Sequence, residues 1–406
     1  MRSHKPRARS ETTLLDALWA HHHAELRNPH EVIVQWESAS EVDPRLLHHV
    51  VRGRFWETLE AAQATLIVTR EYEHLVVALS VFKGRRRVSY LRVPHPNGLA
   101  VDVERRRLFI ASTRNPNMLF ELAPIVELLN RDGAAVADGL EGAMIPVSCR
   151  YLPGGLYVHD IAIIGGRLHA NAVAMNAVVE LPEAGGFRPV WWPHCIDGKS
   201  GPLFRRNYIQ LNSIAAGEDL SSSFFSASAG APAARRPGHL NFPVDGQGVI
   251  FSGRTREVLA AGLTRPHSAR LHRGTLWVDN SGYGEFGRIE AGRFEPVIRL
   301  RGWTRGLCFD GEVAFVGTSR VIPRFRHYAP GVDLNRNETG VHAVDLNTGR
   351  VVGSLVWPLG NQIFAVELAK GLPTLGFPFS GRRDRRRIEE LFFWGRATGP
   401  ARSGVS

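Results

Sequence analysis

Four polar residues in separate segments of the chain have the chemistry of a binding or catalytic site. His159, Asn212 and His267 each stand directly before a short apolar run of strand-forming residues. Two neutral imidazoles with an amide oxygen suit a borderline divalent metal and leave open positions for water or substrate, so these three residues are the predicted ligands of one divalent metal ion. Arg305 heads a fourth run, and its guanidinium is suited to hold a carboxylate or phosphate. Arg305 and Asp160, the neighbour of His159, are the predicted catalytic residues.

These residues belong to six segments that share one pattern: a polar residue, an apolar strand-like run, a turn and a second strand. The segments begin about forty to sixty residues apart, which is the spacing of β-propeller blades. They are Asn97-Gly-Leu-Ala-Val, His159-Asp-Ile-Ala-Ile-Ile, Asn212-Ser-Ile-Ala-Ala, His267-Ser-Ala-Arg-Leu, Arg305-Gly-Leu-Cys-Phe and Gln362-Ile-Phe-Ala-Val. Because the first strand of each blade lines the central channel, the pattern predicts that the polar residues face one shared opening.

The two ends of the chain indicate how the repeat closes. Strand-like runs begin at Ala64, His74 and Val88 without a convincing inner strand before them, whereas the run from Ile363 looks like an inner strand with little strand material after it. Joining the two ends completes one blade and removes exposed sheet edges. The predicted fold is therefore an all-β, six-bladed β-propeller closed by both termini.

Segments outside this repeat differ from it in composition. Residues 1–54 are predicted to form a basic N-terminal tail and a short helical extension, residues 55–378 the propeller, and residues 379–406 a basic C-terminal tail. Helical spacing occurs over 12–26, and a second helix-like piece over 44–62.

The composition is that of a soluble globular protein with a basic periphery. Of the net charge of +11, residues 1–10 and 382–387 each carry +4, and no aromatic residue interleaves with either run, which makes specific nucleic-acid binding an unfavoured reading. Three cysteines without a CxxC pair favour a reducing compartment. With no apolar run near the roughly 18 residues of a membrane span and no signal-peptide segment, we expect a cytoplasmic protein.

Three readings of the polar residues remain open. In the first, the channel mouth binds a small molecule or peptide, as in a metal-assisted hydrolase or lyase whose metal-bound water attacks a substrate positioned by Arg305. In the second, the propeller is a non-catalytic scaffold for a protein partner in a biosynthetic or modification pathway. In the third, the polar side chains only satisfy backbone groups and buried water in the channel.

The same segments, with Arg265-Pro-His-Ser-Ala-Arg-Leu and Trp303-Thr-Arg-Gly-Leu-Cys-Phe among them, resemble a bacterial family of conserved hypothetical proteins described as a domain of unknown function. The resemblance covers roughly residues 55–370 and implies a propeller without an assigned activity. Members usually carry a Gln-Glu-Ile-Phe-Asp-like segment near the C-terminus. This chain has Asn361-Gln-Ile-Phe-Ala, and the loss of the acidic residue at Gln362 weakens the metal hypothesis.

More distantly, the chain is similar to gluconolactonase and NHL-type six-bladed propellers. Those proteins imply a metal at the channel mouth held by Glu and Asn or Asp side chains, where this chain has histidines. The likeness is one of fold, and a fold does not carry a function with it.

Overall fold

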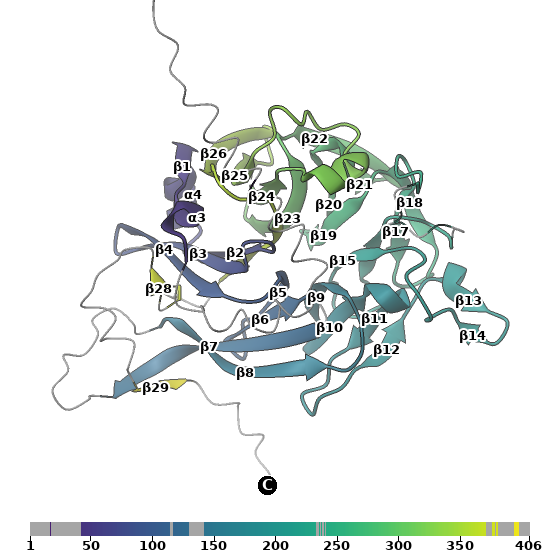
Figure 1. The fold of residues 1–406 in the computed structure, drawn as a ribbon, viewed down its shortest axis with the longest axis horizontal. Coiled ribbons are helices and arrows are strands. Elements are labelled where there is room, and N and C mark those ends of the chain that lie inside the picture. Colours follow the sequence, from purple (N-terminus) through teal and green to yellow (C-terminus); the bar gives the residue numbers. More distant parts are fainter. Residues whose placement is uncertain are drawn as a thin grey trace, which may run out of the picture.

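The structure is a computed structural model that shows six β-sheets arranged in a ring around a common axis (Figure 1). It describes residues 17, 42–113, 117–129, 142–232, 235, 237, 239, 241–370, 376–377, 379–380 and 394–397. The all-β, six-bladed propeller predicted from the sequence is confirmed.

Each blade begins with an inner strand at the edge of its sheet, and each inner strand contacts the next, so that the six form a closed ring. The inner strands of blades 1 to 6 are β5 (Pro96–Asp102), β9 (Val158–Ile164), β15 (Leu211–Ala215), β19 (Pro266–His272), β23 (Trp303–Asp310) and β27 (Ile363–Ala369). They coincide with the six segments identified in the sequence.

The outer strands follow in antiparallel order. Blade 1 adds β6 (Arg107–Ser112), β7 (Asn117–Leu129) and β29 (Trp394–Ala397), with β8 (Met144–Leu152) also on β7; blade 2 adds β10 (Arg167–Ala172), β11 (Ala177–Glu180) and β12 (Arg188–Trp191); blade 3 adds β16 (Phe224–Ala227), β17 (Gly248–Ser252) and β18 (Val258–Leu263). Blade 4 adds β20 (Thr275–Asn280), β21 (Glu285–Glu290) and β22 (Arg293–Arg299); blade 5 adds β24 (Val313–Ser319), β25 (Thr339–Asp345), β26 (Arg350–Trp357) and β1 (Val50–Gly53).

Blade 6 closes the ring with both ends of the chain, as predicted. Its inner strand β27 pairs with β2 (Thr65–Arg70), which is followed by β3 (Leu75–Phe82), β4 (Arg85–Arg92) and β28 (Phe379–Ser380). The strands β1, β28 and β29 come from outside the predicted propeller bounds of 55–378, so chain on both sides of those bounds takes part in the sheets.

The remaining elements are short. They are the helices α3 (Pro44–Leu47) and α4 (Phe55–Ala61), the 3₁₀ helices η2 (Val173–Met175), η3 (His194–Ile196), η4 (Ser281–Tyr283) and η5 (Pro323–Tyr328), and the hairpin of β13 (Asp197–Gly198) and β14 (Gly201–Pro202). The helix-like piece predicted over 44–62 is therefore two helices separated by β1. The predicted helix over 12–26 and the charged runs at 1–10 and 382–387 lie outside the described residues, apart from residue 17.

The core consists of apolar side chains packed between adjacent sheets. Between blades 5 and 6, the helix α4 inserts Phe55 and Leu59, both fully buried, beside Trp357 and Phe315. This packing attaches the N-terminal helix to the blade pair at which the ring closes.

Near the start of every inner strand, its pairing with the adjacent strand of the same blade shifts register. The pairing shifts by one residue between Pro96 and Leu99 in blade 1, and an equivalent shift occurs in each of the other five blades. A bulge of this kind leaves residues out of the regular ladder and redirects their side chains. The bulges therefore explain how the polar residues at the strand heads leave the blade surface for the channel.

Candidate functional site at the channel mouth

The polar residues at the strand heads are buried around one end of the channel. Asn97, His159, Asn212, His267, Arg305 and Gln362 each expose at most 5% of their surface. Burial, with Arg305, Arg265 and His159 as charged or chargeable neighbours, holds the pKa of His267 well below its usual range. Residues from blades 2, 4 and 5 thus act on one another electrostatically, as the sequence pattern predicted for a shared opening.

His267 presents a ring nitrogen to the channel. Its Nδ1 lies 2.8 Å from the carbonyl oxygen of Arg265 and 3.0 Å from Ser281 Oγ. Because a carbonyl oxygen only accepts, Nδ1 carries the proton and Nε2 of the neutral ring keeps its lone pair. Within the described part of the chain, Nε2 has no hydrogen-bond partner. It is therefore available to a metal ion or to a donor group on a ligand.

Asn212 is oriented in a similar way. Its Nδ2 donates to Ser228 Oγ and to the Pro266 carbonyl oxygen, each at 2.9 Å. These two bonds fix the amide plane across the boundary between blades 3 and 4. The other end of the amide, Oδ1, is buried and meets no donor among the residues that the structure describes. The predicted ligand atoms of Asn212 and His267 are thus both uncommitted acceptors.

Arg305 is a buried cation held by an aromatic ring. Its guanidinium carbon lies 3.2 Å from the ring centre of Phe364 and 5.7 Å from that of Trp303. Burial lowers the pKa of Arg305 to about 10, against the opposing effect of the Glu71 carboxylate. Stacking on a ring leaves the N–H groups at the edge of the guanidinium plane for hydrogen bonding. One of them, Nη2, has no acceptor within the described residues.

Glu71 brings a negative charge to the mouth from the end of the chain that closes the ring. It follows β2, and its Oε2 accepts a hydrogen bond from Gln362 Nε2 at 3.0 Å. Its Oε1 lies 3.9 Å from His95 Nδ1. Gln362 is therefore the neighbour of a carboxylate. Sequence reasoning missed Glu71, because only the closure of blade 6 brings it beside the strand heads.

A second ring of residues stands two positions before the strand heads. His95, Tyr157, Gln210 and Arg265 precede β5, β9, β15 and β19, and all four have positive φ between 40° and 54°. This left-handed conformation costs a residue with a side chain about 1 kcal/mol or more and tends to occur where function requires it. A check of the position two residues upstream of each head would have found this ring in the sequence.

Arg265 is the arginine of the second ring and is buried. Its Nη1 donates to Gln210 Oε1 at 2.9 Å, and its guanidinium lies 4.2 Å from the ring centre of Tyr328 in η5. Burial lowers the pKa of Arg265, against the opposing effect of Tyr328 and Tyr157. Arg265 and Arg305 are therefore two buried arginines of the mouth, and Glu71 brings a carboxylate to the same place.

Asp160 has a different surrounding from the other predicted site residues. Its Oδ2 accepts hydrogen bonds from Ile214 N at 3.0 Å and from Arg270 Nη1 at 2.9 Å, and its Oδ1 accepts from Ile161 N at 3.1 Å. Although burial acts to lower it, the pKa of Arg270 is raised, chiefly by Asp160. Asp160 thus joins blade 2 to blades 3 and 4, and its catalytic role stays a prediction.

The residue after the strand head joins blades elsewhere in the ring as well. Ser213 Oγ accepts from Ala269 N at 2.8 Å, and Ser268 Oγ accepts from Gly306 N at 2.7 Å. In blade 1 the same position is Gly98, where a Cβ would lie 2.7 Å from Ile161 N. The inner strands are therefore linked either by a short polar side chain or by direct backbone contact.

In the part of the chain that the structure describes, no three or more His, Cys, Asp or Glu side chains gather in a way that could hold a metal ion. A metal at the mouth would therefore depend on the amide of Asn212. Among the same residues, no helix is long and apolar enough to cross a membrane.

The ring of blades and its buried polar opening define a six-bladed β-propeller with a candidate ligand site at one end of its channel. The chain belongs to the family described as a domain of unknown function (DUF4915), which matches residues 53–376 and confirms the resemblance found in the sequence. A comparison with curated proteins gave no match.

Several solved propeller structures are similar at low sequence identity. The structure of a nidogen/laminin complex is 10% identical with a TM-score of 0.49, covering 76% of this chain and 99% of that one. A gluconolactonase from Xanthomonas campestris is 12% identical with a TM-score of 0.42, covering 73% and 86%. A calcium-binding protein, regucalcin, from Agrobacterium tumefaciens is 14% identical with a TM-score of 0.40, covering 64% and 73%. A likeness at this level does not bring a ligand or an activity to this chain.

Proposed function

We propose that the channel mouth binds a small acid or phosphate ester that also carries hydroxyl or N–H groups. The observation that carries this proposal is the Arg305 guanidinium, which is buried, stacked on Phe364 and left with an N–H that no described residue accepts. Buried donors of this kind normally have an acceptor, and a guanidinium edge matches the two oxygens of a carboxylate or phosphate.

The charges around the mouth support an anion. Arg265 and Arg305 are both buried there, and Glu71 is the carboxylate that most opposes the lowered pKa of Arg305. His267 is neutral at neutral pH, because burial and the arginines hold its pKa well below the usual range. Arg265, Arg305 and Glu71 together leave one positive charge, which a ligand anion would neutralise.

Uncommitted acceptors define the rest of the ligand. Asn97 Oδ1, Asn212 Oδ1 and His267 Nε2 are buried and have no donor among the described residues. Each would repel a second anionic oxygen and accept from a hydroxyl or N–H group. A hydroxy acid or a sugar phosphate satisfies both requirements, whereas an acid with a purely hydrocarbon body satisfies only the first.

Titration calorimetry with three probes tests the proposal. Gluconate carries the acid and the hydroxyls, glucitol carries hydroxyls alone, and hexanoate carries the acid alone. We expect gluconate to bind most tightly and Arg305→Met to weaken it by about 10- to 100-fold, since a hydrogen bond to a charged group contributes roughly 1.5–3 kcal/mol. Arg299→Met, at an exposed arginine paired with Glu285, is the matched control and should leave binding unchanged. Equal binding of gluconate and glucitol, or no effect of Arg305→Met, would refute the proposal.

A second candidate function is a metal-assisted hydrolase or lyase at the same mouth. His267 Nε2 and Asn212 Oδ1 support it, as two uncommitted buried ligand atoms of the kinds that a divalent metal accepts. When bound, the ion would activate a water molecule, while His159, Asn212 and His267 hold it. Arg305 would position the acidic group of the substrate. The two neighbouring arginines act against any cation at this place, so we rank this function second.

Metal analysis of the protein purified without a histidine tag tests the second candidate. Stoichiometric metal that is lost in both His159→Ala and His267→Ala supports it, and metal-free protein contradicts it. Asp160 receives no step in either function, because Arg270 and two backbone amides occupy its carboxylate. The alternative of a non-catalytic scaffold requires the basic tails to hold an acidic partner, and the charged runs at 1–10 and 382–387 lie outside the described residues.

A further inference from the structure

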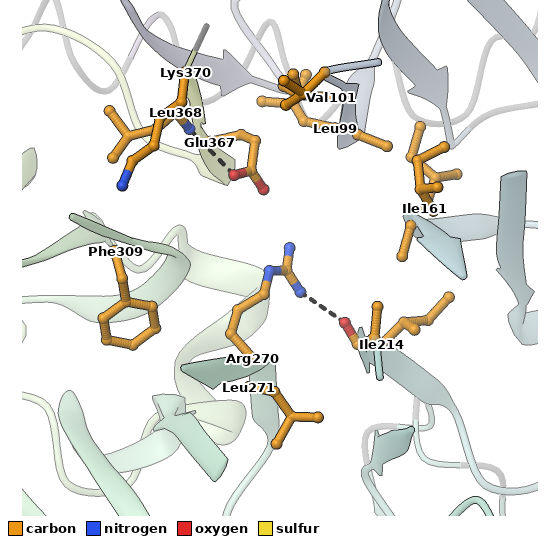
Figure 2. A pocket seen from close by; sticks show the side chains of 15 residues that line it. Leu99, Val101, Ile161, Ile214, Arg270, Leu271, Phe309, Glu367, Leu368 and Lys370 are labelled. Atoms are coloured by element: carbon orange, nitrogen blue, oxygen red, sulfur yellow. Dashed lines mark hydrogen bonds between the residues drawn. The ribbon is translucent and has the colours of Figure 1, made fainter. Parts of the chain in front are cut away.

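The opposite end of the channel contains a second pocket with different chemistry. It has a volume of about 330 Å³, and all six inner strands contribute to its wall. Figure 2 shows its lining, in which aliphatic side chains such as Leu99, Val101, Ile161 and Ile214 surround the opening. The volume is at the lower end of the range of small-molecule sites and equals that of roughly ten water molecules.

The pocket is separate from the mouth. Along β23, its lining residue Phe309 stands four positions after Arg305, which is about 13 Å at the rise of an extended strand. Between the two sites, Arg270 bonds to Asp160 at 2.9 Å. This ion pair lies between the pocket, which Arg270 lines, and the strand head His159, which is the sequence neighbour of Asp160.

The polar groups of the pocket are few, and Arg270 is already occupied. Besides Asp160, its Nη1 donates to the carbonyl oxygens of Ile214 and Ala269, at 3.0 and 2.9 Å. Lys370, at the rim, forms an ion pair with Asp310. Neither cation is therefore free to take an anionic ligand without losing a carboxylate partner.

Glu367 is the polar group that remains for a ligand. Its side chain points toward the middle of the cavity in Figure 2, and its Oε1 accepts one hydrogen bond, from Leu368 N at 3.2 Å. No side chain in the described part of the chain donates to it. Burial raises the pKa of Glu367 to about 7, against the opposing effect of Arg270. This raised pKa is that of a carboxyl group in an apolar wall, where no cation among the described residues contacts Glu367.

We propose that this second pocket binds an apolar amine, with its ammonium group on Glu367 and its hydrocarbon body against the aliphatic wall. The charged groups that face Glu367 are Arg270 from β19, Asp160 from β9, and Lys370 with Asp310 beyond the rim. The thiol of Cys308 from β23 faces it as well, and burial and Glu367 hold the pKa of this thiol well above its usual range, so the thiol carries no charge between pH 6 and pH 8. Asp160 neutralises Arg270 and Asp310 neutralises Lys370, which leaves one negative charge when Glu367 is ionised. An ammonium group supplies the matching positive charge, and the aliphatic lining contributes about 25 cal/mol for each Å² of apolar surface that the ligand buries.

Calorimetric titration of the full-length protein at pH 8 with hexylamine, hexan-1-ol and hexanoate tests the proposal. We expect hexylamine to bind at least tenfold more tightly than the other two probes. Glu367→Gln keeps the shape and removes the charge, so it should abolish that preference, whereas Ala216→Phe should fill the pocket and weaken hexylamine and hexanol alike. Glu312→Gln, at an exposed acid paired with Arg273, is the matched control and should change nothing.

The pH dependence of hexylamine binding is an independent test of the role of Glu367. Between pH 8 and pH 6 the fraction of ionised Glu367 falls about tenfold, so hexylamine affinity should fall about tenfold in the wild type and stay level in Glu367→Gln. Failure of hexylamine to bind more tightly than hexanol, or a preference that survives Glu367→Gln, would overturn the proposal. Gluconate titrated into the same samples reports on the mouth, so a failure at either site can be told from a failure at the other.

Discussion

Replacing Asp160 by Asn removes one charge from the ion pair that joins three blades. The variant keeps an oxygen that can accept from Ile214 N, but Arg270 then remains buried without its carboxylate. Only 6% of the Asp160 side chain and 16% of the Arg270 side chain are exposed, so water cannot replace the lost partner. The structure therefore predicts that Asp160→Asn destabilises the fold, whereas the sequence suggested a catalytic role for Asp160 because it stands next to His159.

The size of the effect follows from burial. Removing one partner of a buried ion pair typically costs about 3–5 kcal/mol, because the remaining charge is left uncompensated. The retained bond from Ile214 N and the two carbonyl contacts of Arg270 place the expected loss near the lower end, at about 3 kcal/mol. Removing both partners, in Asp160→Asn with Arg270→Met, should cost less than the sum of the single changes by about 1 to 3 kcal/mol.

Urea unfolding followed by tryptophan fluorescence measures these free energies for the wild type, the two single variants and the double variant. Glu312→Gln supplies the matched control, since the ion pair of Glu312 with Arg273 is exposed and such pairs contribute at most about 1 kcal/mol. An unchanged free energy of unfolding in Asp160→Asn, together with lost gluconate binding, would refute the structural role and favour a role at the mouth.

Three further predictions concern buried groups in the blades. Burial lowers the pKa of His342 to about 4 in the folded state, so the wild type should lose about 2 kcal/mol of stability between pH 7 and pH 5, and His342→Gln should remove this part of the pH dependence in urea titrations. Glu367 has the opposite sign: its raised pKa of about 7 makes the folded state lose about 2 to 3 kcal/mol as pH rises from 5 to 8, a loss that Glu367→Gln should abolish in the same titrations. Gly98→Ala should destabilise the protein by about 1–3 kcal/mol in urea unfolding, because the added Cβ would lie 2.7 Å from Ile161 N and 2.9 Å from Asp160 Cα; an unchanged midpoint would contradict the close approach of blades 1 and 2.

The repeat was predictable because local chemistry specifies it. In blades 1, 2, 4 and 5 the inner strand joins the next strand through a short hairpin. Turns such as Gly165-Gly166 and Asp310-Gly311 favour positive φ, which the structure shows at Gly165, Gly166 and Gly311. The closure of blade 6 was also predictable, because an inner strand without outer strands and outer strands without an inner strand stood at opposite ends of one sequence. The hairpins are specified by residues close together in the sequence, and the closure follows from the number of strands at each end of the chain.

The site was predictable only in part, because side-chain direction depends on the bulges. His159, His267 and Arg305 share the mouth, as their spacing indicated. One residue further, Asp160 turns toward the next blade, and no pattern of residue types distinguishes these two directions. Glu71 lies beside Gln362 although 291 residues separate the two in the sequence, because the closure of blade 6 brings them together.

The most direct test of the central claim is anomalous diffraction from crystals soaked in selenate and, separately, in manganese. The account predicts a selenium peak at the channel mouth within hydrogen-bonding distance of the Arg305 guanidinium, and loss of that peak in Arg305→Met crystals. A manganese peak held by His159, Asn212 and His267, with no selenium peak at Arg305, would contradict an anion site and establish the metal site in its place.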